Sequence, residues 1–314
     1  MRAKILVPAL AAGLLGLTAC DVSDLGDMER FSKDFHYSYP LNSNGRLWLE
    51  TFNGPVEISG WDQNTVDISG TKYGPTQQAA DELNVNVEHS ADSVSIRVLR
   101  PSERRNNMGA RFVVKVPRTT LLDRITTSNG AIRTSDGSGP ARLRTSNAQI
   151  RVNGLNGSLD AQTSNGPVDL TDVDGDVVAH TSNGQIHGER LNGTLEATTS
   201  NSGVHAEITS PDRPIRVETS NGPVELTLPD GFGRDVRVNT NNSWITLHLP
   251  GTVNAHVMAR TNNSSISTDF DVRMQGEFSK NHMDATIGNG GALLDLSTSN
   301  GAIRLLKSRG RGPA

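Results

Sequence analysis

A short polar motif returns along this chain at a fixed interval. Its copies read Thr-Ser-Asn-Gly or a close variant, and the interval is 18 residues through the middle of the chain, then 20, 21, 21 and 37. The threonines that open the copies are Thr127, Thr145, Thr163, Thr181, Thr199, Thr219, Thr240, Thr261 and Thr298. A fixed interval indicates a repeat architecture, and 18 residues are too few for a propeller blade and lack a helical period. The repeat therefore predicts an all-β fold, a parallel two-sheet β-solenoid with about 18 residues per coil.

Apolar residues follow the same interval. One column consists of Ile132, Ile150, Val168, Ile186 and Val204, and a second of Ala141, Leu159, Val177 and Leu195. Within a coil, apolar and polar residues alternate as in a half-buried strand, and the alternation shifts by one residue across each motif, as expected at a corner. A second corner is marked by glycines that tolerate positive φ, namely Gly139, Gly157, Gly175 and Gly193.

We expect the motif to have a structural role. In stacked coils its asparagines form one interior column in which each side-chain amide bonds to the next, and the threonines form a similar hydroxyl ladder. The predicted ladder consists of Asn129, Asn147, Asn165, Asn183, Asn201, Asn221 and Asn300. The corner glycines, where positive φ is expected, are Gly130, Gly166, Gly184, Gly222 and Gly301. The alternative is that the repeated asparagines bind a ligand.

The beginning of the chain has the layout of an export signal. Basic residues precede the apolar run from Ile5 to Leu17, which is too short to span a membrane. The segment Leu17–Cys20 resembles the lipobox of bacterial lipoproteins, in which the signal is cleaved before the cysteine and the thiol is lipidated. Cys20 is the only cysteine of the chain. We therefore expect a signal peptide over residues 1–19, a tether over residues 20–33, and a membrane anchor through lipid on Cys20.

The rest of the chain divides into three parts. Residues 34–118 depart from the 18-residue rhythm and predict a capping subregion of strands with one short helix that begins after Thr76, because a terminal coil would otherwise expose its core. Residues 119–306 carry the repeat, and residues 307–314 read as a disordered basic tail. A hydrophobic content of 34% fits one elongated core better than two compact ones.

The chain resembles the DUF4097 family of adhesin-like bacterial envelope proteins. The resemblance runs from about Leu47 to Leu306 and rests on four stretches: "LWLETFNGPVEISGWD" from Leu47, "FVVKVP" from Phe112, the motif series, and "IGNGGALLDLSTSNGAIRL" from Ile287. The combination is specific, although a single motif copy would be weak. The resemblance implies a β-solenoid, an envelope location and no established enzymatic activity.

One outward column carries residues typical of catalytic grooves. It reads Arg133, Arg151, Asp169, His187 and His205. Some parallel β-helices cleave polysaccharides, and Arg151, Asp169 and His187 would lie on neighbouring strands, as an acid, a base and an electrostatic partner must. The alternative is a solvated face in which Arg151 and Asp169 pair weakly. We favour the solvated face and assign no catalytic residue.

Other binding chemistry is weakly represented. Asp172, Asp174 and Asp176 are similar to the start of a calcium loop, but the glycine is misplaced and the twelfth position is Asn183 rather than glutamate. We therefore assign no metal and no cofactor. Trp244 is the one tryptophan expected at an exposed corner. The formal net charge of −4, with both signs interspersed, argues against nucleic acid as a partner.

These observations favour a non-catalytic envelope protein over an enzyme. We expect a lipid-anchored solenoid that presents an adhesin-like interaction or scaffold surface to an envelope protein or a glycan. The alternatives are a polysaccharide-cleaving enzyme on the same scaffold and a ligand-sensing accessory of an envelope-stress system. Asp21 after the lipidated cysteine slightly favours the periplasmic face of the inner membrane over the outer membrane, and the cell surface is a further alternative.

Overall fold

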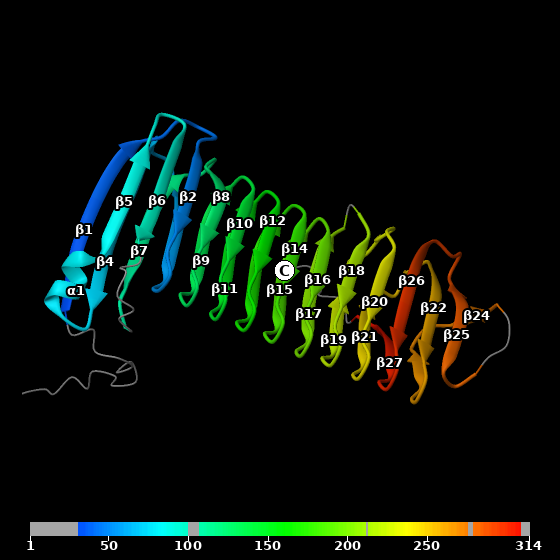
Figure 1. The fold of residues 1–314 in the computed structure, drawn as a ribbon. Helices are drawn as coiled ribbons and strands as arrows, with labels where there is room; N and C mark the ends of the chain where they lie inside the picture. The colour runs from blue at the N-terminus through cyan, green and yellow to red at the C-terminus, as the bar shows by residue number, and fades with distance from the viewer. Residues whose placement is uncertain (1–30, 100–106, 212, 276–278, 309–314) are drawn as a thin grey trace, which may run out of the picture.

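The computed structural model describes residues 31–99, 107–211, 213–275 and 279–308. The predicted signal peptide, Cys20 and nearly all of the predicted tether lie outside these residues. Within them the chain is all-β with one short helix, and its strands form two long sheets that lie along a rod (Figure 1). The predicted two-sheet β-solenoid is confirmed.

The two sheets are called sheet A and sheet B. Sheet A contains, in spatial order, β1 (Phe31–Pro40), β4 (Thr65–Gly74), β7 (Gly109–Pro117), β3 (Val56–Trp61), β9 (Ile132–Ser138), β11 (Ile150–Asn156), β13 (Val168–Asp174), β15 (Ile186–Asn192), β17 (Val204–Ser210), β19 (Val224–Thr227), β21 (Ile245–Leu249), β27 (Ile303–Lys307) and β23 (Ile266–Thr268). Sheet B contains β24 (Val272–Met274), β25 (His282–Ile287), β22 (Ala255–Thr261), β26 (Ala292–Thr298), β20 (Val236–Asn239), β18 (Ile215–Glu218), β16 (Leu195–Thr198), β14 (Val177–His180), β12 (Leu159–Gln162), β10 (Ala141–Arg144), β8 (Leu121–Thr126), β2 (Arg46–Glu50), β6 (Ser93–Leu99) and β5 (Asn84–His89).

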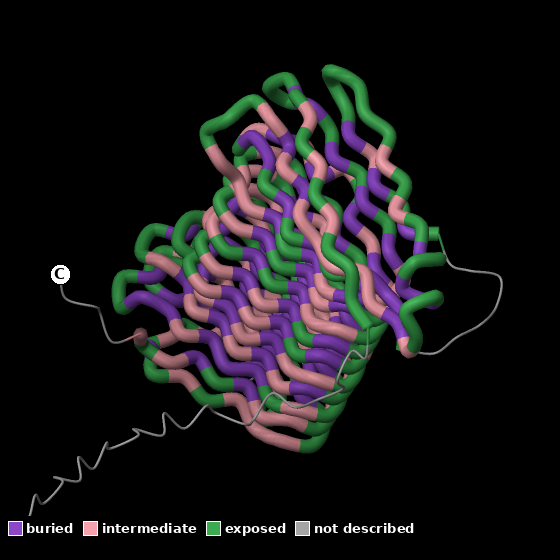
Figure 2. The backbone as a smooth tube through the Cα atoms, turned by 90° about the vertical axis from the view of Figure 1, so that its left-hand side faces the viewer, coloured by how far each residue is buried: buried purple, intermediate pink, exposed green. Residues whose placement is uncertain are grey.

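The central coils stack in the predicted register. Ile150 pairs with Ile132 on one side and Val168 on the other, and Leu159 pairs with Ala141 and Val177. The side chains of these residues are buried, with exposed fractions of 2% or less. Buried residues of successive coils form continuous stripes along the rod (Figure 2). The core is therefore a set of apolar ladders, each coil burying its edge against the next.

Each central coil bends at a third place that the sequence analysis missed. Four residues spaced 18 apart have left-handed backbone: Asp136, Gly154, Asp172 and Arg190, with φ between 52° and 71°. Val152 and Leu155 on either side of Gly154 both point inward, so the alternation shifts across this bend as it does across the motif. Aspartate tolerates the left-handed region better than most residues, whereas Arg190 is an uncommon occupant.

The second corner differs in part from its prediction. Gly157, Gly175 and Gly193 have φ of 153°, 148° and 121°, so their conformation favours glycine as expected. Gly139, in the first complete 18-residue coil, does not have positive φ. The coil of Gly139 stacks against the N-terminal part, which lacks the 18-residue interval, and the backbone at this corner has a different conformation.

The N-terminal cap is made of antiparallel strands and the helix. Strand β4 pairs antiparallel with both β1 and β7, and β5 pairs antiparallel with β6. The helix α1 (Gln77–Glu82) begins after Thr76, whose hydroxyl accepts a hydrogen bond of 3.1 Å from the Ala79 amide, as predicted. Phe35, Tyr37 and Tyr39 of β1 pack against the core. These elements cover the open end of the solenoid (Figure 1).

Both ends of the solenoid place coils out of sequence order. Strands β2 and β3 form a full coil inside residues 34–118, and this coil lies between the outer coil of β6 and β7 and the inner coil of β8 and β9. At the other end, the last coil of the chain is inserted between earlier ones. Its strand β26 lies between β20 and β22 in sheet B, and its strand β27 lies between β21 and β23 in sheet A. The motif copies at Thr261 and Thr298 therefore do not stack in chain order.

Candidate functional site

The motif corner is held together by its threonines. Their side chains are buried, with exposed fractions between 0% and 7%. From Thr145 onward each hydroxyl donates to a backbone carbonyl of the neighbouring coil, at 2.8 to 3.1 Å. At the glycine corners the same hydroxyl accepts a hydrogen bond from the glycine N–H at 3.1 to 3.3 Å. The threonines therefore bond to backbone rather than to one another, unlike the predicted hydroxyl ladder.

The asparagine side chains are linked along the rod, but they are exposed. Each side-chain amide donates to the Oδ1 of the asparagine on the adjacent coil, on the side nearer the N-terminal cap, at 2.6 to 2.9 Å. The linked residues are Asn129, Asn147, Asn165, Asn183, Asn201, Asn221, Asn242, Asn300 and Asn263, and Asn53 continues the series beyond Asn129. The expectation of an interior ladder is wrong, because these side chains lie on the solvent side of the corner.

The motif glycines are required for a different reason from the predicted one. Gly130, Gly166, Gly184, Gly222 and Gly301 do not have positive φ. A Cβ at any of them would lie 1.7 to 1.9 Å from a backbone carbonyl oxygen of the neighbouring coil, so the backbones approach too closely for a side chain. Among the described residues, the N–H bond to the threonine hydroxyl is found at these five corners and not where Ala148, Ser202, Ser243 or Ser264 replaces glycine.

The predicted outward column lies on sheet A. Arg151, Asp169 and His187 pair in register on β11, β13 and β15. Asp169 Oδ2 lies 3.5 Å from the Arg151 guanidinium and also accepts a hydrogen bond from Gln149. The His187 ring bonds to Glu189 at 3.1 Å instead. The three residues are neighbours, but the carboxylate and the imidazole are held by different partners.

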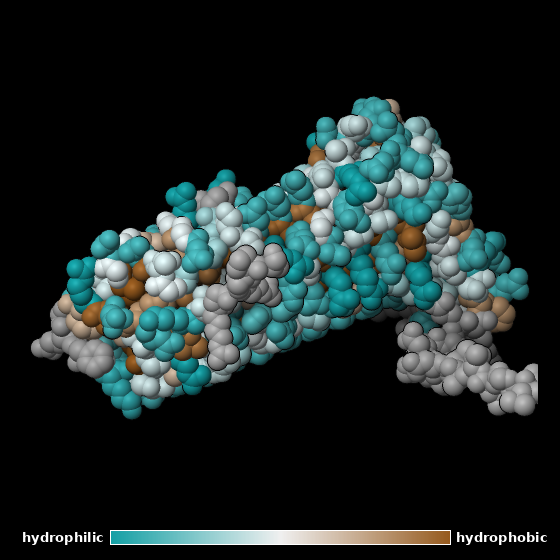
Figure 3. Space-filling model, turned by 180° about the vertical axis from the view of Figure 1, so that it is seen from behind, coloured by the Kyte–Doolittle hydropathy of each residue, from teal (hydrophilic) through white to brown (hydrophobic). Residues whose placement is uncertain are grey.

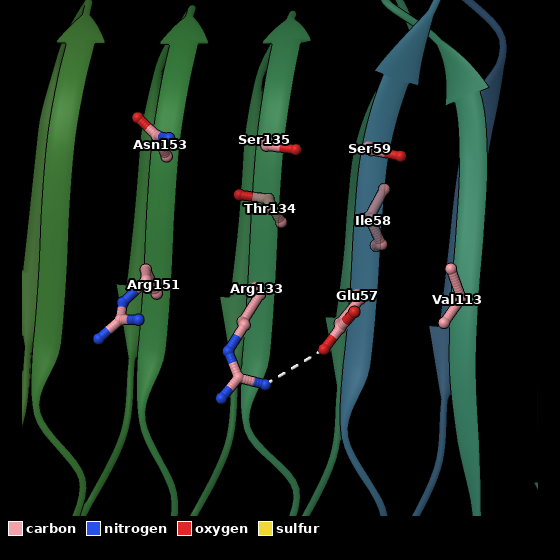
Figure 4. Close-up of a pocket in the computed structure, with 9 residues that line it drawn as sticks. All are labelled: Glu57, Ile58, Ser59, Val113, Arg133, Thr134, Ser135, Arg151 and Asn153. Carbon is pink, nitrogen blue, oxygen red and sulfur yellow. Dashed lines mark hydrogen bonds and ion pairs between the residues drawn. The ribbon is translucent and has the colours of Figure 1, made fainter. Parts of the chain in front are cut away.

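A shallow groove of about 300 Å³ lies beside this column. Figure 4 shows one row of Glu57, Arg133 and Arg151 and a parallel row of Ser59, Ser135 and Asn153. Arg133 Nη1 lies 3.3 Å from Glu57 Oε1. Seen from behind, the middle of the rod is covered mainly by hydrophilic residues, with hydrophobic ones as separate spots (Figure 3). The groove is therefore bordered by charged side chains in one row and small polar side chains in the other, with Ile58 and Val113 also lining it.

Further along the same face, two histidines pair with one glutamate, and a third histidine stacks on one of them. Glu225 lies 3.4 Å from His205 Nδ1 and 2.8 Å from His248 Nε2. The rings of His187 and His205 stack with centroids 5.2 Å apart. Hydrogen bonding from His187 lowers the pKa of Glu189 below its ordinary value. Among the described residues no group of three or more His, Cys, Asp or Glu side chains is placed to hold a metal ion.

The three aspartates compared with a calcium loop point to separate partners. Asp172 accepts two hydrogen bonds from Arg190, at 2.6 and 2.8 Å. Asp174 accepts one from Asn192 at 2.8 Å, and Asp176 pairs with Arg213 at 2.8 Å. Carboxylates that share a calcium ion converge on one point, and these do not.

Two tryptophans are exposed rather than one. Trp244 is 36% exposed at its corner, as predicted, and Trp48 is 41% exposed on β2. The exposure of Trp48 was not predicted, although Leu47 and Leu49 on either side of it are apolar and the alternation of a strand turns Trp48 outward.

Trp48 lies where the regular ladder of sheet B is interrupted. Leu47 pairs with Leu122 of β8, but Trp48 pairs with Arg124, so Asp123 is an extra residue in β8. The same extra residue appears against β10, where Ala141 pairs with Leu122 and Leu143 with Ile125. This β-bulge lets Asp123 and Arg124 both reach the outer surface, and bulges of this kind re-aim side chains beside functional sites.

The surface around the bulge is a groove of about 470 Å³, called here the Trp48 groove. It is lined by Trp48, Asp123, Arg124, Arg142, Arg144 and Asp160. The Arg124 guanidinium lies 5.9 Å from the centroid of the Trp48 ring. Arg142 lies 3.5 Å from Asp123, and Arg144 lies 3.3 Å from Asp160. An exposed indole beside several guanidinium groups is typical of binding surfaces.

The fold and these surfaces define a capped parallel β-solenoid with polar outer faces. No helix among the described residues is long and apolar enough to cross a membrane. The chain matches no family profile and no curated protein, so the resemblance to the DUF4097 family stays a prediction.

Two solved structures are similar to the chain. One is described as a candidate cell adhesion protein from Clostridium sporogenes ATCC 15579, with 13% identity, a TM-score of 0.26, and coverage of 88% of this chain and 100% of that one. The other is described as a candidate adhesin from Bacteroides fragilis NCTC 9343, with 12% identity, a TM-score of 0.32, and coverage of 88% and 97%. Superpositions this weak carry no functional argument, which must come from the chain's own geometry.

Proposed function

We propose that this chain is a non-catalytic, membrane-anchored protein of the bacterial cell envelope whose solenoid presents an interaction surface to an envelope protein or a glycan. The observation that carries the proposal is the Trp48 groove. Its side chains stand on four adjacent strands of one sheet, β2, β8, β10 and β12, so their spacing is set by backbone hydrogen bonds. A backbone that is held rigid in strands loses little conformational entropy when a ligand binds.

The proposal of a non-catalytic role is supported by the outward face of sheet A. Catalysis by an acid and a base needs both groups within reach of one reacting bond. Asp169 pairs with Arg151 and accepts a hydrogen bond from Gln149, whereas His187 bonds to Glu189. Incubation of the purified protein with envelope and extracellular polysaccharides should leave their chain lengths unchanged. Shortening that disappears in Arg151→Ala or His187→Ala would establish the enzyme instead.

The anchor is proposed from the sequence of the export signal. Lipidation of Cys20 would tether the solenoid to a membrane, with the inner membrane slightly favoured by Asp21. Metabolic labelling with a fatty acid should mark the wild type and miss Cys20→Ser. Equal labelling of both proteins would remove the anchor from the proposal without affecting the groove.

The interaction surface is tested by binding to isolated envelopes. Envelope fragments from cells that lack this protein should bind the added wild type saturably, and Trp48→Ala should bind more weakly. Trp244→Ala is the matched control, because it removes the other exposed indole far from the groove. Equal binding by all three proteins, or no saturable binding, would contradict the proposal.

A further inference from the structure

The open side of the Trp48 ring faces a small neighbour. In sheet B, Trp48 pairs with Arg124 of β8 on one side and with Ser95 of β6 on the other. The Arg124 guanidinium lies over the ring at 5.9 Å from its centroid, whereas the serine is too short to cover an indole. Trp48 therefore offers one apolar ring face to a flat ligand while a guanidinium group is held at the other.

The groove carries more positive than negative charge, although the chain as a whole is acidic. Arg46 extends the same surface, where a second groove shares Asp123, Arg142 and Asp160 with the first. Four guanidinium groups, of Arg46, Arg124, Arg142 and Arg144, thus face two carboxylates, of Asp123 and Asp160. A third carboxylate, Asp176, is paired with Arg213 at 2.8 Å. Among the described residues, no carboxylate pairs with the guanidinium of Arg46 or Arg124.

The two ion pairs in the groove are easily exchanged. The Arg142 and Asp123 side chains are 64% and 42% exposed, and those of Arg144 and Asp160 are 47% and 29% exposed. Exposed pairs at 3.3 to 3.5 Å contribute little to stability. These arginines can therefore turn toward a ligand carboxylate, which a guanidinium binds through two parallel hydrogen bonds.

We propose that the Trp48 groove binds an acidic polysaccharide whose sugar rings carry carboxylates. The inference rests on the proposed function and names the ligand class. The apolar face of a sugar ring fits on the open face of the indole, the uronate carboxylates pair with the guanidinium groups, and Asp123 and Asp160 accept hydrogen bonds from hydroxyl groups. Arginine is common in protein interfaces but aspartate is depleted there, and both Asp123 and Asp160 line this groove.

The test uses the full processed lipoprotein in detergent and measures affinity by titration calorimetry. The probes are polygalacturonate and alginate, which are two polyuronates of different stereochemistry, carboxyl-reduced polygalacturonate, which is neutral, and polyphosphate, which is an anion without sugar. At least one polyuronate should bind, and the neutral and sugar-free polymers should bind at least about tenfold more weakly. Trp48→Ala and Arg124→Gln should each lower the affinity about tenfold, as expected for a central tryptophan or arginine.

Two matched controls keep the result specific. Trp244→Ala removes the other exposed indole, and Arg237→Gln removes an exposed arginine of the Arg142 column that pairs with Asp295 at 3.0 Å. Both should bind like the wild type, and every variant should remain folded at the temperature of the titration because each substituted side chain lies at the surface. The proposal is overturned if neither polyuronate binds, if the neutral polymer or polyphosphate binds equally, or if the controls lose as much affinity as Trp48→Ala.

The outcomes separate this inference from the proposed function. Saturable binding to envelopes without binding to either polyuronate would leave the proposed function standing and end the inference, and loss of that binding after protease treatment would identify a protein partner. Shortening of a bound polyuronate would end the non-catalytic proposal and keep the ligand class.

Discussion

The side-chain amide of Asn300 donates a hydrogen bond of 2.8 Å to Oδ1 of Asn242, which lies 58 residues earlier in the chain. The motif copy of Asn263 lies between them in the sequence, yet in space Asn263 is bonded to the far side of Asn300, at 2.7 Å. The last coil of the chain is therefore an internal coil. It joins the outermost strands to the regular solenoid, so the C-terminal segment should contribute far more to stability than an end segment usually does.

This arrangement predicts unequal costs for the same substitution at two places in one ladder. Ile303 of β27 is fully buried and pairs with Ile245 and Ile266, whereas Ile266 of β23 is half-buried at the edge of the sheet. Ile303→Ala should lower the free energy of unfolding by about 2 to 5 kcal/mol, and Ile266→Ala by clearly less. Urea unfolding of both variants checks the order, and an equal or reversed order would contradict the inserted coil.

A second prediction concerns the two side chains that define the motif. Thr163 is 4% exposed; its hydroxyl donates to the Ala148 carbonyl at 3.0 Å and accepts from the Gly166 N–H at 3.3 Å. Thr163→Val keeps the shape but leaves these backbone groups without a partner, which should cost about 1 to 3 kcal/mol. Asn165→Ala removes exposed amide bonds that water can replace, and should cost about 1 kcal/mol or less. Melting curves that rank Asn165→Ala as the more destabilised would show that the asparagine ladder stabilises the corner more than the threonine bonds do.

The regular part of the fold was predictable because its signal repeats. Ile150 and Val168 occupy one column in the sequence, and the same columns pair in the structure. Two corners of each coil were also predicted, one from the shift in the alternation of apolar residues and one from its glycines, whereas the bend at Gly154 was missed although the alternation shifts across it too. The sequence did not reveal why each corner needs its particular residues. Asn165 is exposed, whereas Gly166 lies against the backbone of the neighbouring coil, and both properties depend on the coil beside them.

The ends of the solenoid and the Trp48 groove escaped prediction for a related reason. Asn53 belongs to a motif copy, but it lies 76 residues before Asn129, its bonded neighbour, because the cap is inserted between them. A motif predicts that a coil exists but does not predict which coil lies beside it. The bulge at Asp123 likewise exists only relative to β2 and β10, and without their pairing nothing in the sequence places Arg124 over Trp48.

A third prediction compares two glycines in different surroundings. A Cβ on Gly166 would lie 1.9 Å from the Ala148 carbonyl oxygen, whereas a Cβ on Gly251 would meet no atom within 4 Å. Gly166→Ala should therefore force the coils apart and cost about 1 to 3 kcal/mol, and Gly251→Ala should change stability by about 0.5 kcal/mol at most. Chemical unfolding measures both. Equal stability of the two variants would mean that the corner has room for a side chain.

The last prediction concerns pH and the ion pair of the left-handed bend. Hydrogen bonding from Arg190 holds the pKa of Asp172 below its ordinary value. A carboxyl with a lowered folded pKa stabilises the fold above the unfolded pKa, about 4, and this contribution is lost as the pH falls through the folded pKa. Asp172→Asn, which suits the left-handed backbone, should therefore melt below the wild type at pH 7, and the gap should close in stronger acid. In an Arg190→Gln background the same substitution should show little pH dependence, and a gap that persists unchanged into acid would rule out the ion pair as its cause.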